Sequence, residues 1–331
     1  MRSGLRLPVT EGEPSLDRAV YVYFERAMGG MLSAGSFDRS HHMSKRSRNL
    51  GNSMSAYWVI AALWLCVAAA SPQNSPPHSA SLTSLTSLTS LTSGQAVDFA
   101  ENWVANWFAP SRGQRGPNVY RHESDGVALG VFWDTDTNPQ YPGKFSNISD
   151  CSYFISATLK KAYGWTDATL KTWLCPAAYP CARRPLARHY YNAILHSRRF
   201  LIIPKVARLA RGDLIAIRYN SGSDTGHVVW IDSQVSLSGT GTDVSGATIY
   251  YYNVDVIDSS STYHGTADLR AINGIGHGIG RGTMRLVTYA DGDLAGYTWS
   301  SWSGSRLYIN GDGQGRRIVA GRYDKSRPGT R

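Results

Sequence analysis

Apolar side chains recur with two different spacings along this chain, and the change of spacing predicts its architecture. Between residues 96 and 108 they come every three or four positions, as in a helix with one buried face, and similar spacing runs from 151 to about 163. From residue 214 onward, short apolar runs alternate with Gly, Ser, Asp and Asn turns, which is typical of strands. Helices packed on a following antiparallel sheet give an α+β fold. Besides these two helices, we predict shorter helices at 168–174 and 186–197, and strands at 214–219, 227–233, 247–257, 283–289, 295–299 and 316–322.

A different pattern precedes this folded region. A basic stretch at 45–48 leads into an apolar core at 56–70 that ends in three alanines, the order of a secretory signal peptide. The core is shorter than the roughly 20 apolar residues of a membrane span, although an uncleaved anchor is the alternative. We predict a signal peptide at 43–70 and a secreted or cell-envelope protein. Residues 1–42 are then a disordered leader or an over-extended reading frame; the alternative is a cytoplasmic tail.

Low-complexity sequence follows the signal peptide. Residues 71–94 contain three prolines and a Ser-Leu-Thr repeat of period three that runs from 81 to 93. Such a repeat has no helical or strand face to bury, so we predict a disordered linker. The folded domain is predicted at 95–323, with a short tail at 324–331.

The charge distribution bears on the partner. The formal net charge is +10 and 42% of the residues are hydrophobic, which suits a folded globule with a substantial core. Between Asp167 and Asp213 the chain has no acidic residue. A basic face attracts anionic polymers such as cell-wall glycopolymers, or acidic peptides; the alternative is a solvated surface without a partner. No nucleic-acid-binding signature accompanies the charge, so we expect no nucleic acid partner. We also expect a monomer. The basic residues of this span are Lys171, Arg183, Arg184, Arg188, Arg198, Arg199, Lys205, Arg208 and Arg211.

The three cysteines outside the predicted signal peptide separate into a pair and a single thiol. Cys175 and Cys181 are close enough in sequence to form a disulfide in an oxidising compartment. Cys151 is then free, and it follows Asp150 at the predicted start of a helix. The positive end of a helix dipole lowers the pKa of a thiol there, so we predict that Cys151 is a nucleophile. The alternative is a small buried residue that faces the core.

Two further residues complete a predicted catalytic set. His227 opens an apolar strand, where its ring can act as general base and acid. Asp258 ends a strand in which alternation places it on one face with two valines, so that its carboxylate can hold the imidazole in place. His264 and Asp255 are the alternatives to Asp258.

The remaining signals concern the oxyanion and metals. An oxyanion hole needs the Cys151 backbone N–H and a second donor, for which Tyr141 is the candidate. Neither His-Glu-x-x-His, paired Cys-x-x-Cys nor Gly-x-Ser-x-Gly occurs, so a metalloprotease, zinc module or serine esterase has no support. No metal or cofactor is predicted. Alternating glycines between 274 and 282 predict a flexible loop near the cleft.

Four segments resemble a known group. They read Asn-Pro-Gln-Tyr-Pro at 138–142, Asp-Cys-Ser-Tyr-Phe-Ile-Ser at 150–156, Gly-Asp-Leu-Ile at 212–215 and Gly-His-Val-Val at 226–229. They are similar to the amidase domain of the NlpC/P60 and CHAP superfamily, over roughly residues 95–260. The resemblance implies a papain-like α+β fold that acts on amide bonds, commonly in bacterial cell-wall peptides.

By that resemblance Cys151 takes the nucleophile position and His227 the base. This chain departs from the family pattern at Tyr153, where relatives have asparagine, and in a long insert at 174–205. The third catalytic residue is not fixed by a motif.

We therefore expect a secreted cysteine amidase or peptidase that cleaves peptidoglycan peptides through an acyl-enzyme at Cys151. Two alternatives stay open. The basic span favours a non-catalytic cell-wall-binding module of the same fold, and the same chemistry also suits a toxin or effector that acts on a protein.

Overall fold

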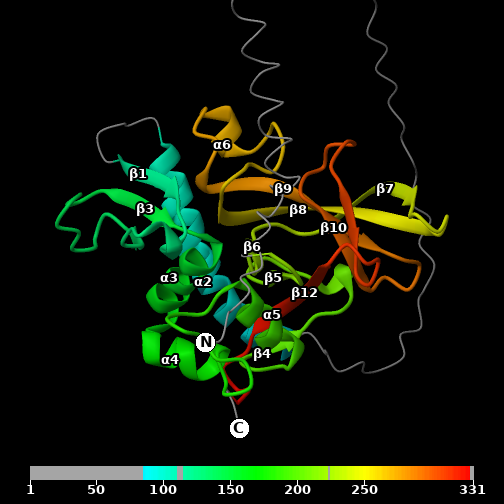
Figure 1. Ribbon diagram of the computed structural model, residues 1–331, viewed down its shortest axis with the longest axis horizontal. Helices are drawn as coiled ribbons and strands as arrows, with labels where there is room; N and C mark the ends of the chain where they lie inside the picture. Colours follow the sequence, from blue (N-terminus) through cyan, green and yellow to red (C-terminus); the bar gives the residue numbers. More distant parts are fainter. Residues whose placement is uncertain (1–84, 110–114, 223, 329–331) are drawn as a thin grey trace, which may run out of the picture. The chain divides into compact units, whose positions relative to one another are not determined.

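The computed structural model describes residues 85–109, 115–222 and 224–328 (Figure 1), and the predicted leader and signal peptide lie outside these residues. The first described helix, α2 (Leu85–Phe108), contains the helix predicted at 96–108 but begins earlier. Residues 85–94 are therefore helical, and the prediction of a disordered linker is wrong for them. No proline lies between residue 77 and the end of α2, so nothing in the repeat stops a helix from extending backward from its buried part.

The short helix α6 (Leu269–Ile272) was not predicted from the sequence. Three further helices lie close to where the sequence predicted them. Their bounds are α3 (Cys151–Tyr163), α4 (Asp167–Leu174) and α5 (Ala187–Leu195). Helix α3 packs against α2 and against two strands of the main sheet, while α5 covers a different part of the same sheet. A Cys175–Cys181 disulfide, with its Cα atoms 5.4 Å apart, closes the loop between α4 and α5 and confirms the predicted pairing.

Two sheets are present in the described residues. The larger is antiparallel, in the order β11-β10-β9-β8-β6-β5-β12-β4, with β7 also paired to β8. The smaller is mixed, in the order β1-β3-β2, with β1 parallel to β3. The bounds are β1 (Arg115–Tyr120), β2 (Gly130–Phe132), β3 (Phe145–Ser149), β4 (Phe200–Ile202), β5 (Leu214–Tyr219), β6 (Gly226–Ile231), β7 (Ser236–Thr242), β8 (Thr248–Ser260), β9 (Gly278–Thr288), β10 (Leu294–Thr298), β11 (Leu307–Ile309) and β12 (Arg316–Tyr323).

The large sheet curls into a half-barrel, and its central strands β5 and β6 are buried on both faces. Strand β12 lies against β10 and β11 although it is not paired with them, and the side chain of Asn310 bonds to the Ile318 backbone N–H at 2.8 Å. On one face Val228 and Trp230 join the core beneath the helices. On the other, Val229 and Ile231 join a second core inside the curl. The fold is α+β, as predicted. The central strands β5 and β6 have nearly continuous apolar sequences because both faces of the sheet are covered there.

The prediction for the alternating glycines is wrong, because the last of them belong to strand β9 rather than to a loop. The strand begins at Gly278. A Cβ at Gly280 would lie 2.6 Å from the Arg270 side chain, and one at Gly282 would lie 2.3 Å from the carboxylate of Asp268. These glycines therefore make room for a buried charged pair that packs directly on the strand.

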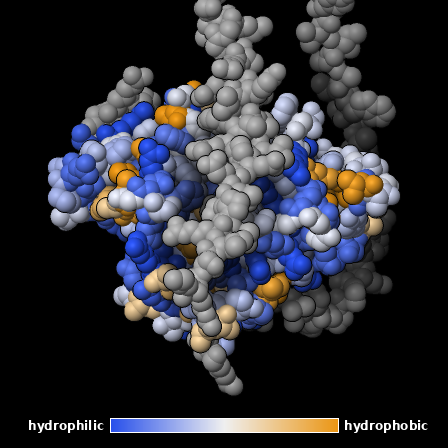
Figure 2. Space-filling model, viewed as in Figure 1, coloured by the Kyte–Doolittle hydropathy of each residue, from blue (hydrophilic) through white to orange (hydrophobic). Residues whose placement is uncertain are grey.

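The described surface is mostly polar on the face in Figure 2. Apolar residues gather at the end of the molecule formed by the β7–β8 hairpin, where Leu237 and Val244 are exposed. Within the described residues, no helix has the length and apolar character needed to cross a membrane.

Much of the basic span is paired with acidic residues from other parts of the chain. Arg211 bonds Asp98 and Glu101 on α2, both at 2.6 Å. The other pairs with carboxylates are Arg211 with Asp232, Arg183 with Glu123, Arg184 with Asp150 and Glu123, and Lys205 with Asp293. Among the described residues, those of the span without a carboxylate partner are Lys171, Arg188, Arg198, Arg199 and Arg208.

Candidate active site

The start of α3 is fixed by Asp150. Its carboxylate caps the helix by accepting the Tyr153 N–H at 2.9 Å and also accepts the Ser152 hydroxyl at 2.9 Å. Arg184 forms an ion pair with the same carboxylate, and His122 lies 3.8 Å away. Burial alone would raise the pKa of Asp150, but the nearby His122 side chain and the Arg184 charge lower it to about 2. The residue before the predicted nucleophile is thus a buried, ionised carboxylate.

Cys151 is the free cysteine of the described residues, and only 4% of it is exposed. Its Sγ lies 4.0 Å from the carbonyl oxygen of Gly226. The nearby Val228 backbone N–H acts to lower the pKa of the thiol. The thiol therefore lies against the backbone of β6 next to His227. This contact exists because only the last part of β6 pairs with β8, which leaves the first part facing the start of α3. Alternation along β6 turns the His227 ring to the face of Ile217 and Val229, opposite the face that packs with Cys151.

The predicted lowering of the Cys151 pKa is wrong. Burial raises the pKa of this thiol well above its ordinary value, and the charges of Asp150 and Asp224 raise it further. The helix dipole has an effect of limited size, and here burial and nearby carboxylates outweigh it. The resting side chain is a neutral thiol.

His227 and Asp258 meet as predicted. His227 Nε2 lies 2.5 Å from Asp258 Oδ2, and both side chains are buried. The imidazole also packs edge-on against Trp299, with ring centroids 5.2 Å apart. Because Nε2 is engaged by the carboxylate, Nδ1 is the ring nitrogen that can exchange a proton with a reacting group. Gly226 allows β5 to approach, since a Cβ there would lie 1.9 Å from the carbonyl oxygen of Ile217.

The two alternatives to Asp258 occupy different environments. His264 belongs to the same cluster, with its Nε2 2.9 Å from Asp258 Oδ2. Asp255 lies three positions earlier on β8 and accepts the Thr283 hydroxyl at 2.7 Å, away from His227. Asp258 is therefore the carboxylate that can orient the imidazole.

Asp258 is held by a buried network that the sequence did not reveal. Arg270 Nη1 lies 2.9 Å from Asp258 Oδ1, and Arg270 Nη2 lies 2.7 Å from Asp268 Oδ2. Asp258, Asp268 and Arg270 are all fully buried, and Arg270 lies on α6. Burial would raise the pKa of Asp258, but the charges of Arg270 and His264 hold it well below its ordinary value.

His227, Asp258 and His264 are residue types that can also bind a metal ion. One donor atom each of His227, Asp258 and His264 lie within 4.8 Å of one another. However, the Arg270 guanidinium already lies against this carboxylate, and a second cation would be repelled by it. The residues fit a hydrogen-bonded network rather than a resident metal.

A cavity of about 230 Å³ opens beside Cys151. Its wall carries more acidic than basic groups, since Glu123, Asp150 and Asp224 face a single arginine, Arg184. The lining residues are Tyr120, His122, Glu123, Ser124, Asp150, Cys151, Ser152, Arg184, Leu186, Ala187, Asp224, Thr225 and Gly226.

Tyr120 stands in this cavity where Tyr141 was predicted. Burial, followed by the charges of Cys151 and Asp150, raises the pKa of Tyr120 well above its ordinary value, so its hydroxyl is a neutral donor close to the thiol. Tyr141 is not among the lining residues and lies in a turn, with its N–H on Asn138 Oδ1 at 3.2 Å. Tyr120 is placed by the parallel pairing of β1 with β3, for which the sequence has no local signal.

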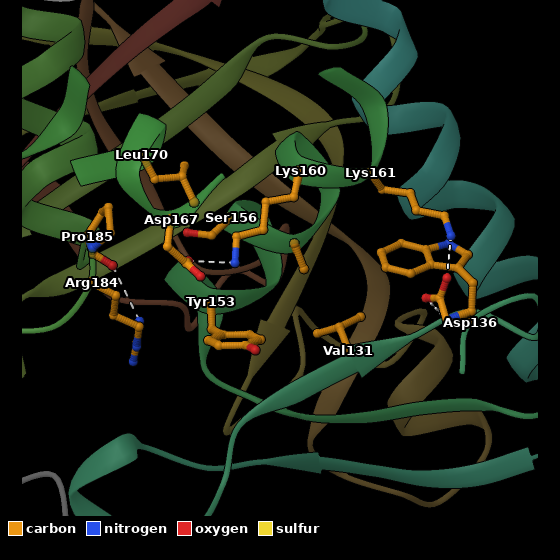
Figure 3. A pocket seen from close by; sticks show the side chains of 12 residues that line it. Val131, Asp136, Tyr153, Ser156, Lys160, Lys161, Asp167, Leu170, Arg184 and Pro185 are labelled. Carbon is orange, nitrogen blue, oxygen red and sulfur yellow. Dashed lines mark hydrogen bonds and ion pairs between the residues drawn. The ribbon is translucent and has the colours of Figure 1, made fainter. Parts of the chain in front are cut away.

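A second cavity of about 290 Å³ adjoins the first and shares Arg184 with it (Figure 3). Its floor is the face of α3 that carries Tyr153, and the Arg184 guanidinium lies over the Tyr153 ring at 5.7 Å. Figure 3 shows Lys160 pointing toward Asp167, with which it forms an ion pair at 2.6 Å. The insert at 174–205 thus supplies Arg184 to both cavities.

Comparisons with known proteins give one relative without a stated activity. No family model matches the chain, and no solved structure matches it. A protein of Acanthamoeba polyphaga mimivirus, named uncharacterized protein R653, is 33% identical over 220 residues, which is 64% of this chain and 90% of the viral one.

Proposed function

Since the chain belongs to the same family as the mimivirus protein, whose name states no activity, we propose its function from the site alone: it is a cysteine-dependent amide hydrolase. One observation carries this proposal. A free thiol at a helix N-terminus lies against the backbone of His227, whose ring is bonded to a buried, ionised Asp258. Nucleophile, base and orienting carboxylate on a helix and two strands are the arrangement of papain-like hydrolases, to which the resemblance also pointed.

Each residue has a role in the proposed reaction. As Sγ of Cys151 attacks the carbonyl carbon, Nδ1 of His227 takes the thiol proton, and Asp258 stabilises the imidazolium through Nε2. Because the pKa of Cys151 is raised, the proton leaves during the attack rather than before it. The tetrahedral oxyanion accepts hydrogen bonds from the Cys151 backbone N–H and the Tyr120 hydroxyl. His227 then protonates the departing amine, and water activated by His227 hydrolyses the thioester.

The proposed substrate is a cell-wall peptide, which enters between two cavities of different character. The scissile amide lies in the acidic cavity beside Cys151, and the rest of the peptide extends past Arg184 into the second cavity. An anionic wall polymer would contact the basic residues between Asp167 and Asp213 that have no carboxylate partner among the described residues, such as Lys171 and Arg188. Secretion by a signal peptide at 43–70 would bring the enzyme to this substrate.

Digestion of peptidoglycan fragments tests the proposal. The full chain is incubated with purified muropeptides, and the products are analysed by mass spectrometry. We expect fragments that together carry the mass of one added water, and none with Cys151→Ala, because only the thiol can form the acyl intermediate. Cleavage that persists in Cys151→Ala would contradict the proposal.

The same experiment separates the alternatives. Salt-sensitive binding to whole sacculi, equal in wild type and Cys151→Ala and without any released peptide, would favour a wall-binding module instead. Cleavage of proteins but not of muropeptides would keep the chemistry and replace the substrate.

A further inference from the structure

The hydrogen-bond partners of His264 determine its protonation. Nδ1 lies 2.7 Å from the backbone carbonyl oxygen of Trp299, and Nε2 lies 2.9 Å from Asp258 Oδ2. A carbonyl oxygen can only accept a hydrogen bond, and so can an ionised carboxylate. Both ring nitrogens must therefore donate, which requires a doubly protonated, cationic ring.

The other way to satisfy these contacts is a protonated Asp258 that donates to Nε2. The neighbours of Asp258 oppose it. Its Oδ2 already accepts from His227 at 2.5 Å, and the Arg270 guanidinium lies against Oδ1. Although burial acts in the opposite direction, the Arg270 charge keeps the pKa of Asp258 well below its ordinary value. The carboxylate is ionised, so the proton belongs to the imidazole.

The charges around His264 balance when it is cationic. Two of the titratable groups near His264 are Arg270, on α6, and Asp268, the residue before α6. Asp268 accepts the His264 backbone N–H at 2.8 Å. The other two are Asp258, on β8, and His227, on β6. The ring centroids of His227 and His264 are 6.5 Å apart. Trp299 stacks on the His264 ring, and β9 presents Gly282 to it, neither of which titrates. Two aspartates, one arginine and a cationic His264 sum to zero, so His227 is neutral in a balanced cluster.

We propose that His264 is held as an imidazolium and acts as a positioning residue, which neutralises Asp258 and thereby keeps His227 in the neutral form that can accept a proton. The charge of His264 is independent of the proposed function. Its consequence for catalysis rests on that function, because only a base must be neutral.

Nitrogen NMR of the full chain labelled with ¹⁵N-histidine tests the charge directly. At about pH 8, above the ordinary histidine pKa of about 6.5, we expect one ring with both nitrogens protonated. That signal should be absent from His264→Gln and present in His196→Gln, which replaces an exposed histidine. An unprotonated ring nitrogen on His264 would overturn the inference, and this measurement on the wild-type chain does not depend on whether the variant folds.

The pH profile of amide hydrolysis tests the consequence. Without the His264 charge, Asp258 attracts a proton onto His227 more strongly, so the acid limb of the profile should move to higher pH. A unit charge removed at this distance predicts a shift of about one pH unit, and none for His196→Gln. An unshifted limb in folded His264→Gln would overturn the positioning role. If the ring is cationic but no amide is cleaved, the charge assignment stands and the proposed function fails.

Discussion

Replacing Asp258 with asparagine is expected to lower kcat/KM for amide hydrolysis by on the order of 10³-fold. The asparagine side chain has one acceptor oxygen where the carboxylate has two. Both histidines bond to one carboxylate oxygen, and the Arg270 guanidinium lies against the other. A His227 ring that loses its acceptor at Nε2 can hold its proton on Nδ1 instead. That tautomer cannot take the proton of the Cys151 thiol, so the base is lost while the nucleophile remains.

Asp255→Asn is the matched control for this prediction. It makes the same chemical change on the same strand, but Asp255 bonds to Thr283 and not to the histidines. We expect its kcat/KM to stay within about threefold of wild type, since partly buried hydrogen bonds away from the site contribute little to catalysis. Circular dichroism should show both variants folded. Equal activity of the two variants would contradict the role of Asp258.

The largest expected effect on stability comes from Arg270→Met. This guanidinium is fully buried between Asp258 and Asp268. Its removal leaves Asp268 without its cation and Asp258 with the two histidines alone. Loss of one partner from a buried ion pair costs about 3–5 kcal/mol of unfolding free energy. Arg183→Met removes a pair with Glu123 that is largely exposed, for which we expect a loss below about 1 kcal/mol. Urea denaturation at neutral pH measures both values.

The deficit of Arg270→Met should depend on pH. In the wild type the pKa of Asp258 is held well below its ordinary value, so its stabilising contribution is present above the unfolded pKa of about 3.9 and is lost as the pH falls toward the folded value. In the variant, Asp258 has lost the guanidinium charge that lowers its pKa, so less of this stabilisation is present at neutral pH. The difference between the two proteins should therefore be greatest at neutral pH and shrink below about pH 4. A deficit that does not change with pH would argue that packing, rather than charge, explains the loss.

Local patterns were sufficient for the elements that carry Cys151, His227 and Asp258. The helix after Asp150 has both a capping residue and apolar periodicity, and alternation along β8 placed Asp258 on the buried face with Val254 and Val256. These signals lie within about a dozen residues of each other, which is the range over which periodicity is informative.

The features that were missed depend on contacts between distant parts of the chain. The pKa of Cys151 is set by burial and by carboxylates from other elements, neither of which a helix N-terminus reveals. Tyr120 reaches the cavity through a parallel pairing with β3, and its strand contains Gly116 and Pro117, which hide it from a strand pattern. The buried pair formed by Arg270 and Asp268 is visible in the sequence only as the glycines of β9 that accommodate it.

The proposed mechanism depends most on the transfer of a proton from the buried Cys151 thiol to the His227 imidazole. The direct measurement is the rate of iodoacetamide alkylation of Cys151 at neutral pH, followed by peptide mass spectrometry, in wild type and in His227→Ala. General base assistance predicts that the wild-type thiol reacts at least about 10²-fold faster. Equally slow alkylation of Cys151 in the two proteins would contradict it.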